Sequence, residues 1–233
     1  MARVGTTPIL ALDVPTAADA LELVAHLDTR CDFYKVGNEL FTAAGPGMVR
    51  ELAARGKSVF LDLKFHDIPN TVAGGVRNAA SLGARLVTVH ASGGVAMLQR
   101  AVEAAGDDCG VLAVTVLTSL TGPELAEAWG RDAGSLQVRD EVLRLADTAA
   151  RAGAHGIVCS GHEAAAVRAR FGEGLSVLVP GVRAAGGAVQ DQARVVTPGE
   201  AAAAGARYVV VGRLVTAAAD RLSAMDAVRA ELA

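Results

Sequence analysis

The chain has 233 residues, a formal net charge of −3 at pH 7, and a composition that is 52% hydrophobic but only 3% aromatic. That length suits one large domain, and the slightly acidic balance excludes the basic surface that binds nucleic acids or anionic membranes. The three cysteines suggest neither a disulfide framework nor a zinc motif, because their number is odd and no CxxC spacing occurs. The first apolar run ends at Asp13, too soon for a signal peptide or a membrane span, so we expect a cytoplasmic protein.

Short runs rich in β-branched residues predict strands that alternate with helical segments. The eight runs are residues 8–13, 32–37, 57–62, 85–90, 110–116, 155–160, 175–180 and 206–211. Between most of them apolar residues recur at helical spacing, as in 16–27 and 135–153. Because no linker interrupts this alternation, we predict one α/β domain over residues 1–233, a (β/α)8 TIM barrel. An open doubly wound sheet is the alternative.

Polar residues fall at or just after the carboxyl ends of these predicted strands. They are Asp13, Lys35, Asp62, Lys64, His90, Thr118, Ser160, Arg183 and Arg213. In a (β/α)8 barrel the carboxyl ends of the strands meet on one face, where active sites of this fold are built. Residues that are far apart in sequence are therefore expected to form one cluster.

The segment FLDLKFHDIPNTV (60–72) places Asp62, Lys64 and Asp67 close together among apolar residues. Strand alternation puts Asp62 and Lys64 on one face, and Lys35 comes from the neighbouring predicted strand. These charges form either a structural ion-pair network or a preorganised electrostatic site. Buried ion pairs add little net stability, which favours the site.

The segments PGVR (180–183) and VGR (211–213) follow the last two predicted strands, where this fold often holds a phosphate. Glycine lets backbone N–H groups approach the oxygens, and arginine offers a two-pronged charged donor. The alternative is an ordinary pair of turns with surface arginines. Between them, residues 184–198 form a long aperiodic segment, which we interpret as a lid over the phosphate with Gln192 as a donor, rather than a passive loop.

Two histidines are the remaining candidates for a role in the site. His90, at a strand end, either lines the pocket or packs in the core. His162 lies three residues after Cys159, but no second pair of ligands completes a tetrahedral site, so we expect no metal.

Taken together, these motifs resemble the bacterial orotidine 5′-phosphate decarboxylase family, which converts orotidine 5′-monophosphate to UMP and CO2 in de novo pyrimidine biosynthesis. The resemblance covers essentially the whole chain, and DLKFHDIPNT is its most specific segment. The matching segments are ALDVP (11–15), YKVGNELF (34–41), FLDLKFHDIPNTV (60–72), VHASGG (89–94), AVTVLTS (113–119), VCSGHEA (158–164), PGVR (180–183), DQARVVTP (191–198) and VVVGR (209–213).

The resemblance implies a role for individual residues of this chain. The catalytic array would be Lys35, Asp62, Lys64 and Asp67. The substrate would be bound by Asp13 and Lys35 at the ribose, by Asp62, by Thr118 at the pyrimidine, and by Arg183, Gln192, Gly212 and Arg213 at the phosphate. Asp67 and Thr71 would reach into the neighbouring subunit's site, which implies a homodimer with shared sites.

The expected chemistry follows from the charge that develops when CO2 leaves. Loss of CO2 from C6 of the orotate ring leaves an electron pair that no π-system accepts, so a cation is needed beside C6. Lys64 would stabilise this carbanion and then protonate it, and the flanking carboxylates would favour its charged form. No metal or other cofactor is then required. Asp62 would also repel the substrate carboxylate, by about 4 kcal/mol for charges roughly 4 Å apart at an effective dielectric of about 20.

Two other functions are weighed against this one. Magnesium-dependent sugar-phosphate decarboxylases and aldolases of the same suprafamily keep the Asp62, Lys64 and Asp67 pattern, but they have a metal-binding glutamate where this chain has Lys35. The second is a non-catalytic barrel that senses a nucleotide such as UMP. Such a binder gains nothing from two carboxylates aimed at an anionic ligand.

Overall fold

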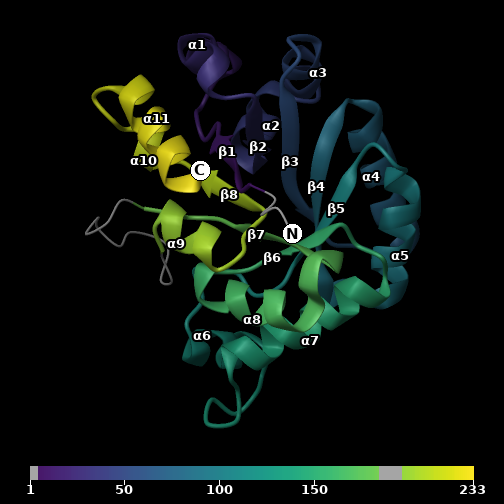
Figure 1. Cartoon of the computed structure of the whole chain (residues 1–233). Coiled ribbons are helices and arrows are strands. Elements are labelled where there is room, and N and C mark those ends of the chain that lie inside the picture. The colour runs from purple at the N-terminus through teal and green to yellow at the C-terminus, as the bar shows by residue number, and fades with distance from the viewer. Residues whose placement is uncertain (1–4, 184–195) are drawn as a thin grey trace.

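Eight parallel strands lie side by side in chain order and close into a barrel, because β8 pairs with β1 (Figure 1). The computed structural model describes residues 5–183 and 196–233. The strands are β1 (Thr7–Ala11), β2 (Phe33–Gly37), β3 (Ser58–Phe65), β4 (Ala84–His90), β5 (Gly110–Val114), β6 (Gly156–Val158), β7 (Ser176–Val179) and β8 (Tyr208–Val211). An open sheet has two unpaired edges, so this closure confirms the (β/α)8 barrel and rules out the doubly wound alternative.

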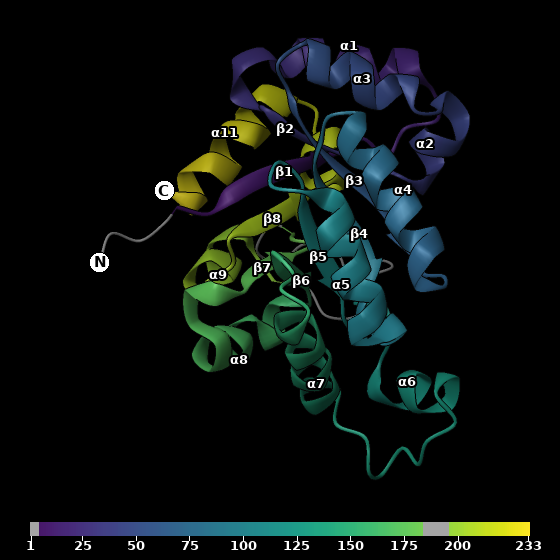
Figure 2. The same ribbon diagram turned by 90° about the vertical axis from the view of Figure 1, so that its right-hand side faces the viewer.

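Helices connect the strands and cover the outside of the barrel (Figure 2). They are α1 (Ala17–Leu27), α2 (Asn38–Ala44), α3 (Gly47–Ala54), α4 (Pro69–Ser81), α5 (Gly94–Ala105), α6 (Gly122–Ala128), α7 (Val138–Arg151), α8 (Gly161–Phe171), α9 (Pro198–Ala203), α10 (Arg213–Thr216) and α11 (Arg221–Leu232), with 3-10 turns at Asp28–Arg30, Ala91–Gly93 and Gly172–Gly174. Polar side chains cap the N-termini of several of these helices. Thr16 caps α1 and Asp220 caps α11, each by accepting hydrogen bonds from backbone N–H groups. Within the described ranges, no helix is long and apolar enough to cross a membrane.

The core has two layers, one on each face of the barrel wall. Alternate residues of the strands fill the inside with Ile9, Ala11, Phe60, Leu86, Leu112, Val114, Val158, Leu178 and Val210. The remaining strand residues pack outward against the helices in a larger cluster that includes Leu10, Tyr34 and Val87. Since these side chains fill the inside of the barrel, a ligand must bind beyond them, where the strands end.

The predicted strands are confirmed in number and place, with small shifts at their ends. The important difference is β3, which continues to Phe65 instead of ending at Asp62. Its pairing with β4 loses register between Leu61 and Phe65. A bulge of this kind bends a strand and re-aims its side chains, and here it falls on Asp62 and Lys64.

Candidate active site

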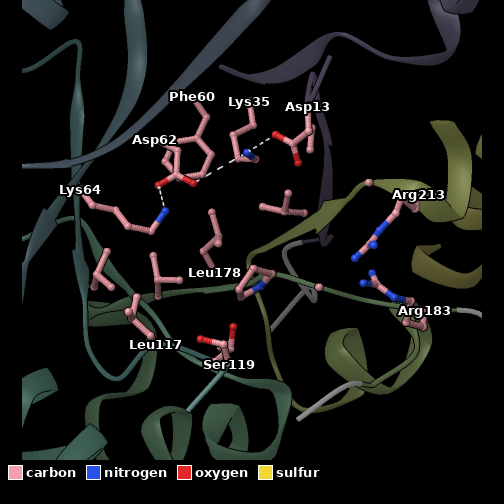
Figure 3. Close-up of a pocket in the computed structure, with 18 of the residues that line it drawn as sticks. Asp13, Lys35, Phe60, Asp62, Lys64, Leu117, Ser119, Leu178, Arg183 and Arg213 are labelled. Atoms are coloured by element: carbon pink, nitrogen blue, oxygen red, sulfur yellow. Dashed lines mark hydrogen bonds and ion pairs between the residues drawn. The ribbon is translucent and has the colours of Figure 1, made fainter. Parts of the chain in front are cut away.

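A cavity of about 520 Å³ opens at the carboxyl ends of the strands. Its floor consists of apolar side chains from inside the barrel, including Phe60 and Leu178. Figure 3 shows the polar side chains on two sides of this floor, with Asp62 and Lys64 on one side and two arginines on the other. The lining residues that the sequence also predicted are Asp13, Lys35, Asp62, Lys64, Thr118, Arg183, Gly212 and Arg213.

Charges alternate in sign along one wall of the cavity, which we call the charged wall (Asp13, Lys35, Asp62 and Lys64). Lys35 Nζ donates to Asp13 Oδ1 at 2.8 Å and lies 3.9 Å from Asp62 Oδ2. Lys64 Nζ donates to Asp62 Oδ1 at 2.9 Å. The Asp62 carboxylate is thus held between two ammonium groups, and its side chain is only 13% exposed. Charges fixed in this way are ready to act on a substrate without reorganising.

Strand geometry explains how β2 and β3 contribute to this wall, beside Asp13, which follows β1. Lys35 alternates with Phe33 along β2, and Asp62 alternates with Phe60 along β3, so all four side chains point into the barrel. Gly37, the next inward position of β2, leaves room for the ion pair. A Cβ atom there would lie 2.9 Å from Lys35 Nζ and 3.5 Å from Asp13 Oδ1.

Lys64 has a left-handed backbone, with a φ of +52°. A residue with a Cβ atom pays roughly 1 kcal/mol or more to adopt this conformation, so the surrounding structure must hold it there. Strain of this kind is typical of functional sites. The register shift between β3 and β4 lies at the same residues.

The opposite wall of the cavity is formed by the turns after β7 and β8. Arg183 and Arg213 line it, and Figure 3 shows their side chains pointing toward one another. Gly181 has a φ of +71°, a conformation that favours glycine. The predicted phosphate donor Gln192 and most of the predicted lid over 184–198 lie outside the described residues. The backbone N–H of Arg183 donates to the Val196 carbonyl at 3.0 Å, which joins the two described ends of this segment.

Asp67 and Thr71, which the resemblance assigns to the neighbouring subunit's site, do not line the cavity of their own chain. Both are exposed and lie at the start of α4, beyond the end of β3. The Asp67 carboxylate accepts the backbone N–H of Ile68 at 2.6 Å. The neighbouring Ile68 is itself 67% exposed. The chain alone therefore supplies the charged wall without Asp67.

His90 packs beside the site and does not line the cavity. Its ring lies 5.3 Å from that of His66, measured between centroids. Burial lowers the pKa of His90 below its ordinary value, and the nearby His66 and Lys64 act in the same direction. Ser160, another polar residue at a strand end, caps α8 by accepting the backbone N–H of His162 at 3.2 Å.

Sequence reasoning missed several residues of the site. Ser119 and Thr216 line the cavity, and Phe60 and Leu178 form part of its floor. Strand alternation could have identified the floor residues. Phe60 lies two positions before Asp62, and Leu178 lies two positions before the PGVR turn, so each shares a strand face with a predicted site residue or turn. Among the described residues, no group of three or more His, Cys, Asp or Glu side chains is arranged to hold a metal ion.

Comparison with known sequences places the whole chain in one family. The profile of the orotidine 5′-phosphate decarboxylase / HUMPS family matches residues 6–228. The orotidine 5′-phosphate decarboxylase of Halorhodospira halophila is 50% identical over 232 residues, which cover 97% of this chain and 95% of that protein. The protein of the same name from Anaeromyxobacter sp. (strain K) is 53% identical over 224 residues, covering 95% of this chain and 96% of that one.

Solved structures agree with the sequence comparison. The crystal structure of orotidine 5′-phosphate decarboxylase from Lactobacillus acidophilus superposes with a TM-score of 0.86 at 35% identity, covering 97% of this chain and 99% of that chain. The enzyme from Pyrococcus horikoshii gives a TM-score of 0.77 at 25% identity, covering 97% and 99%. A matched profile over nearly all residues, relatives at half identity and a shared barrel lead to one conclusion: this chain belongs to the orotidine 5′-phosphate decarboxylase / HUMPS family.

Proposed function

We propose that this chain decarboxylates orotidine 5′-monophosphate to UMP and CO2 in pyrimidine biosynthesis. The observation that carries the proposal is the charged wall, which holds Lys64 against Asp62 at 2.9 Å in a cavity that also contains two arginines. Such a cavity matches a substrate with a carboxylate at one end and a phosphate at the other. The names of the relatives, at 50% identity and above over nearly the whole chain, point to the same reaction.

The two walls have different tasks in this proposal. Arg183, Arg213 and the backbone at Gly212 bind the phosphate, together with Gln192. Asp13 and Lys35 bind the ribose hydroxyls, and Thr118 contacts the pyrimidine. The distant phosphate contacts supply binding energy that is used at the reacting carbon, so orotidine without its phosphate should lose turnover as well as affinity.

The charged wall performs the chemistry. The bond between C6 and the carboxylate carbon breaks, its electron pair stays on C6, and CO2 leaves. The Lys64 ammonium stabilises that carbanion and then transfers a proton from Nζ to C6, and solvent returns the proton to the lysine. No metal or organic cofactor takes part in these steps.

Asp62 has a second proposed effect on the bound substrate. Its carboxylate lies between two ammonium groups and is largely shielded from water. A substrate carboxylate placed nearby would be repelled by about 4 kcal/mol at roughly 4 Å, and relief of that repulsion as CO2 leaves corresponds to about three powers of ten in rate.

We also propose that Asp67 and Thr71 complete the site of a second subunit in a homodimer. Their exposed position at the start of α4, outside their own cavity, and the exposed Ile68 beside them fit a surface covered by another copy. Mixing Lys64→Ala with Asp67→Ala protein tests this idea. Shared sites would restore about a quarter of the sites after random subunit exchange, because one site of each mixed dimer is intact. Self-contained sites would restore none.

A cytoplasmic location stays a prediction from the sequence.

A sugar-phosphate reaction that depends on magnesium is the second candidate, since the family description joins two groups. Lys35 argues against it. Its ammonium lies 2.8 Å from Asp13 and 3.9 Å from Asp62, so a divalent cation between these carboxylates would meet a positive charge instead of a ligand.

The test follows the ultraviolet absorbance of orotidine 5′-monophosphate as purified protein converts it to UMP in excess EDTA. We expect rapid turnover that EDTA does not slow. Turnover of sugar phosphates that chelation abolishes would instead identify the second candidate. Binding of UMP by a folded protein with no turnover of either substrate would identify a nucleotide sensor.

A further inference from the structure

Thr88 is a buried polar residue next to the charged wall that has no part in the proposed reaction so far. It lies on β4 between the inward-facing Leu86 and His90, so its side chain points into the barrel. It is 1% exposed, and it does not line the cavity. A buried hydroxyl needs hydrogen-bond partners, and the partners of this one are the groups that form the charged wall.

The Thr88 hydroxyl makes two directed hydrogen bonds. Its oxygen accepts the backbone N–H of Lys64 at 2.8 Å, and its own proton goes to Asp62 Oδ1 at 2.9 Å. Asp62 Oδ1 also accepts Lys64 Nζ at 2.9 Å. A closed ring of hydrogen bonds therefore links the backbone of Lys64, the hydroxyl of Thr88, the carboxylate of Asp62 and the ammonium of Lys64.

The register shift in the sheet explains why a threonine is needed at this position. Leu61 pairs with Val87 and Phe65 pairs with Val89, so the three residues 62–64 of β3 face the single residue Thr88 of β4. A backbone N–H in such a bulge lacks its usual partner in the neighbouring strand. The Thr88 side chain takes the place of that partner, and it does so at Lys64, where the backbone is left-handed.

We propose that Thr88 is a positioning residue of this active site. Its hydroxyl holds the Asp62 carboxylate and the left-handed backbone of Lys64 in one arrangement, and this aims the Lys64 ammonium at the reacting carbon. The inference rests on the proposed decarboxylation. It extends the proposal because Thr88 touches no substrate and acts only through the two residues that do.

Two substitutions of Thr88 separate the hydroxyl from the rest of the side chain, and a third substitution elsewhere is the control. Thr88→Val keeps the shape but removes both hydrogen bonds, and Thr88→Ser keeps the hydroxyl but removes the methyl group. The matched control is Thr115→Val. Thr115 is also buried, at 4% exposure, but its hydroxyl donates to the backbone carbonyl of Val158 at 2.7 Å, away from the charged wall.

We expect Thr88→Val to lower kcat by about ten- to a hundredfold, the effect of losing a hydrogen bond to a charged group that aligns the reacting lysine. KM and the affinity for UMP should stay within about threefold of the wild type, because the phosphate and ribose contacts are intact. Thr88→Ser should recover most of kcat. Thr115→Val should keep the wild-type kcat, even if it lowers the melting temperature as much as Thr88→Val does.

Several results would overturn the inference. One is a kcat for Thr88→Val equal to that of Thr115→Val, and another is a Thr88→Ser enzyme as slow as Thr88→Val, which would mean that packing matters and the hydroxyl does not. If Thr88→Val does not fold, Thr88→Ala and Thr88→Ser decide, and equal kcat values for these two would refute the role. Absence of turnover by the wild type would instead contradict the proposed function, and the inference with it.

Discussion

The two ends of the barrel both carry polar residues around a cavity, but they use them differently. At the carboxyl ends, charged side chains contact one another inside the cavity, and Lys64 holds a left-handed backbone. At the amino ends, a smaller cavity of about 350 Å³ is lined by His155, whose Nε2 lies 3.2 Å from the Tyr208 hydroxyl. Polar groups at the carboxyl ends face a cavity that suits a ligand, whereas those at the amino ends tie elements together.

Two lysines at opposite ends of the same strand, β3, show the same contrast. Lys57, just before β3, donates to the carbonyl oxygens of Asp28 and Cys31 and to the exposed carboxylate of Asp32 at 2.7 Å. Lys64, at the other end of the strand, meets the largely buried Asp62. Lys57 thus holds the loop before β2 to β3, whereas Lys64 is available to a substrate. Residues at the amino ends should govern stability and those at the carboxyl ends activity.

Apart from the two lysines themselves, the largest difference should come from the carboxylates that pair with them, Asp62 with Lys64 and Asp32 with Lys57. Asp62→Asn removes the negative charge between Lys35 and Lys64 and should lower kcat by about a thousandfold, as estimated from the proposed repulsion of the bound substrate. Asp32→Asn is the control at the amino ends and should leave kcat unchanged. Steady-state kinetics on both proteins decide. Equal activities of the two variants would remove the distinction between the ends.

A smaller loss is expected for the arginine wall. Arg213→Ala should raise KM and lower kcat/KM by about ten- to a hundredfold, since it removes charge-assisted hydrogen bonds to the phosphate. Its effect on orotidine, which lacks the phosphate, should be negligible. Arg207→Ala, at the amino end of β8, serves as the control because Arg207 packs over the Tyr208 ring at 5.7 Å. Equal losses on both substrates would contradict the phosphate assignment.

Filling the space beside the ion pair of Lys35 and Asp13 should lower kcat/KM by about tenfold. The Cβ of Gly37→Ala would lie 2.9 Å from Lys35 Nζ and push the lysine away from Asp13. A displacement of this size in a reactive array should lower kcat/KM by about tenfold. Gly47→Ala is the matched control, because a Cβ atom at that position would have no neighbouring atom within 4 Å. Wild-type kinetics for Gly37→Ala would show that the close approach is harmless.

The smallest effect is on stability and comes from the amino ends. Burial lowers the pKa of His155 below its ordinary 6.5, and Arg207 and Arg85 act in the same direction. The unfolded chain therefore binds this proton more readily, so the free energy of unfolding should fall as the pH drops through 6.5 toward the folded pKa. Urea denaturation between about pH 7 and pH 5 should give a shallower dependence for His155→Gln. An identical pH dependence in both proteins would contradict this account, and kcat at pH 7 should not change.

Much of the architecture can be predicted from the sequence because it depends on local periodicity. Strand alternation and the common direction of the strands are enough to bring Asp13, Lys35, Asp62 and Lys64 together, since in a parallel barrel all strand ends meet at one face. The continuation of β3 to Phe65 is not predicted, because no residue type in 62–64 favours a bulge.

Other features depend on packing across the barrel and leave no local signal. Thr88 looks like any β-branched residue in a buried strand, and its role emerges only when β3 loses register opposite it. Gly37 has an ordinary extended backbone, so only the position of the neighbouring ion pair explains it. For His90, strand alternation gives the face of the side chain but not its depth relative to the cavity, so the sequence does not decide its role.

The most direct test of the contrast between the two ends compares Lys64→Ala with Lys57→Ala, assayed with orotidine 5′-monophosphate in excess EDTA and by thermal unfolding. The account predicts that Lys64→Ala loses about four or more powers of ten in kcat/KM, from combined proton transfer and charge stabilisation, and stays folded. Lys57→Ala should melt at a lower temperature and keep its turnover. A Lys64→Ala enzyme that retains wild-type turnover, or a Lys57→Ala enzyme that is folded and inactive, would contradict the central claim that the charged wall at the carboxyl ends performs the chemistry.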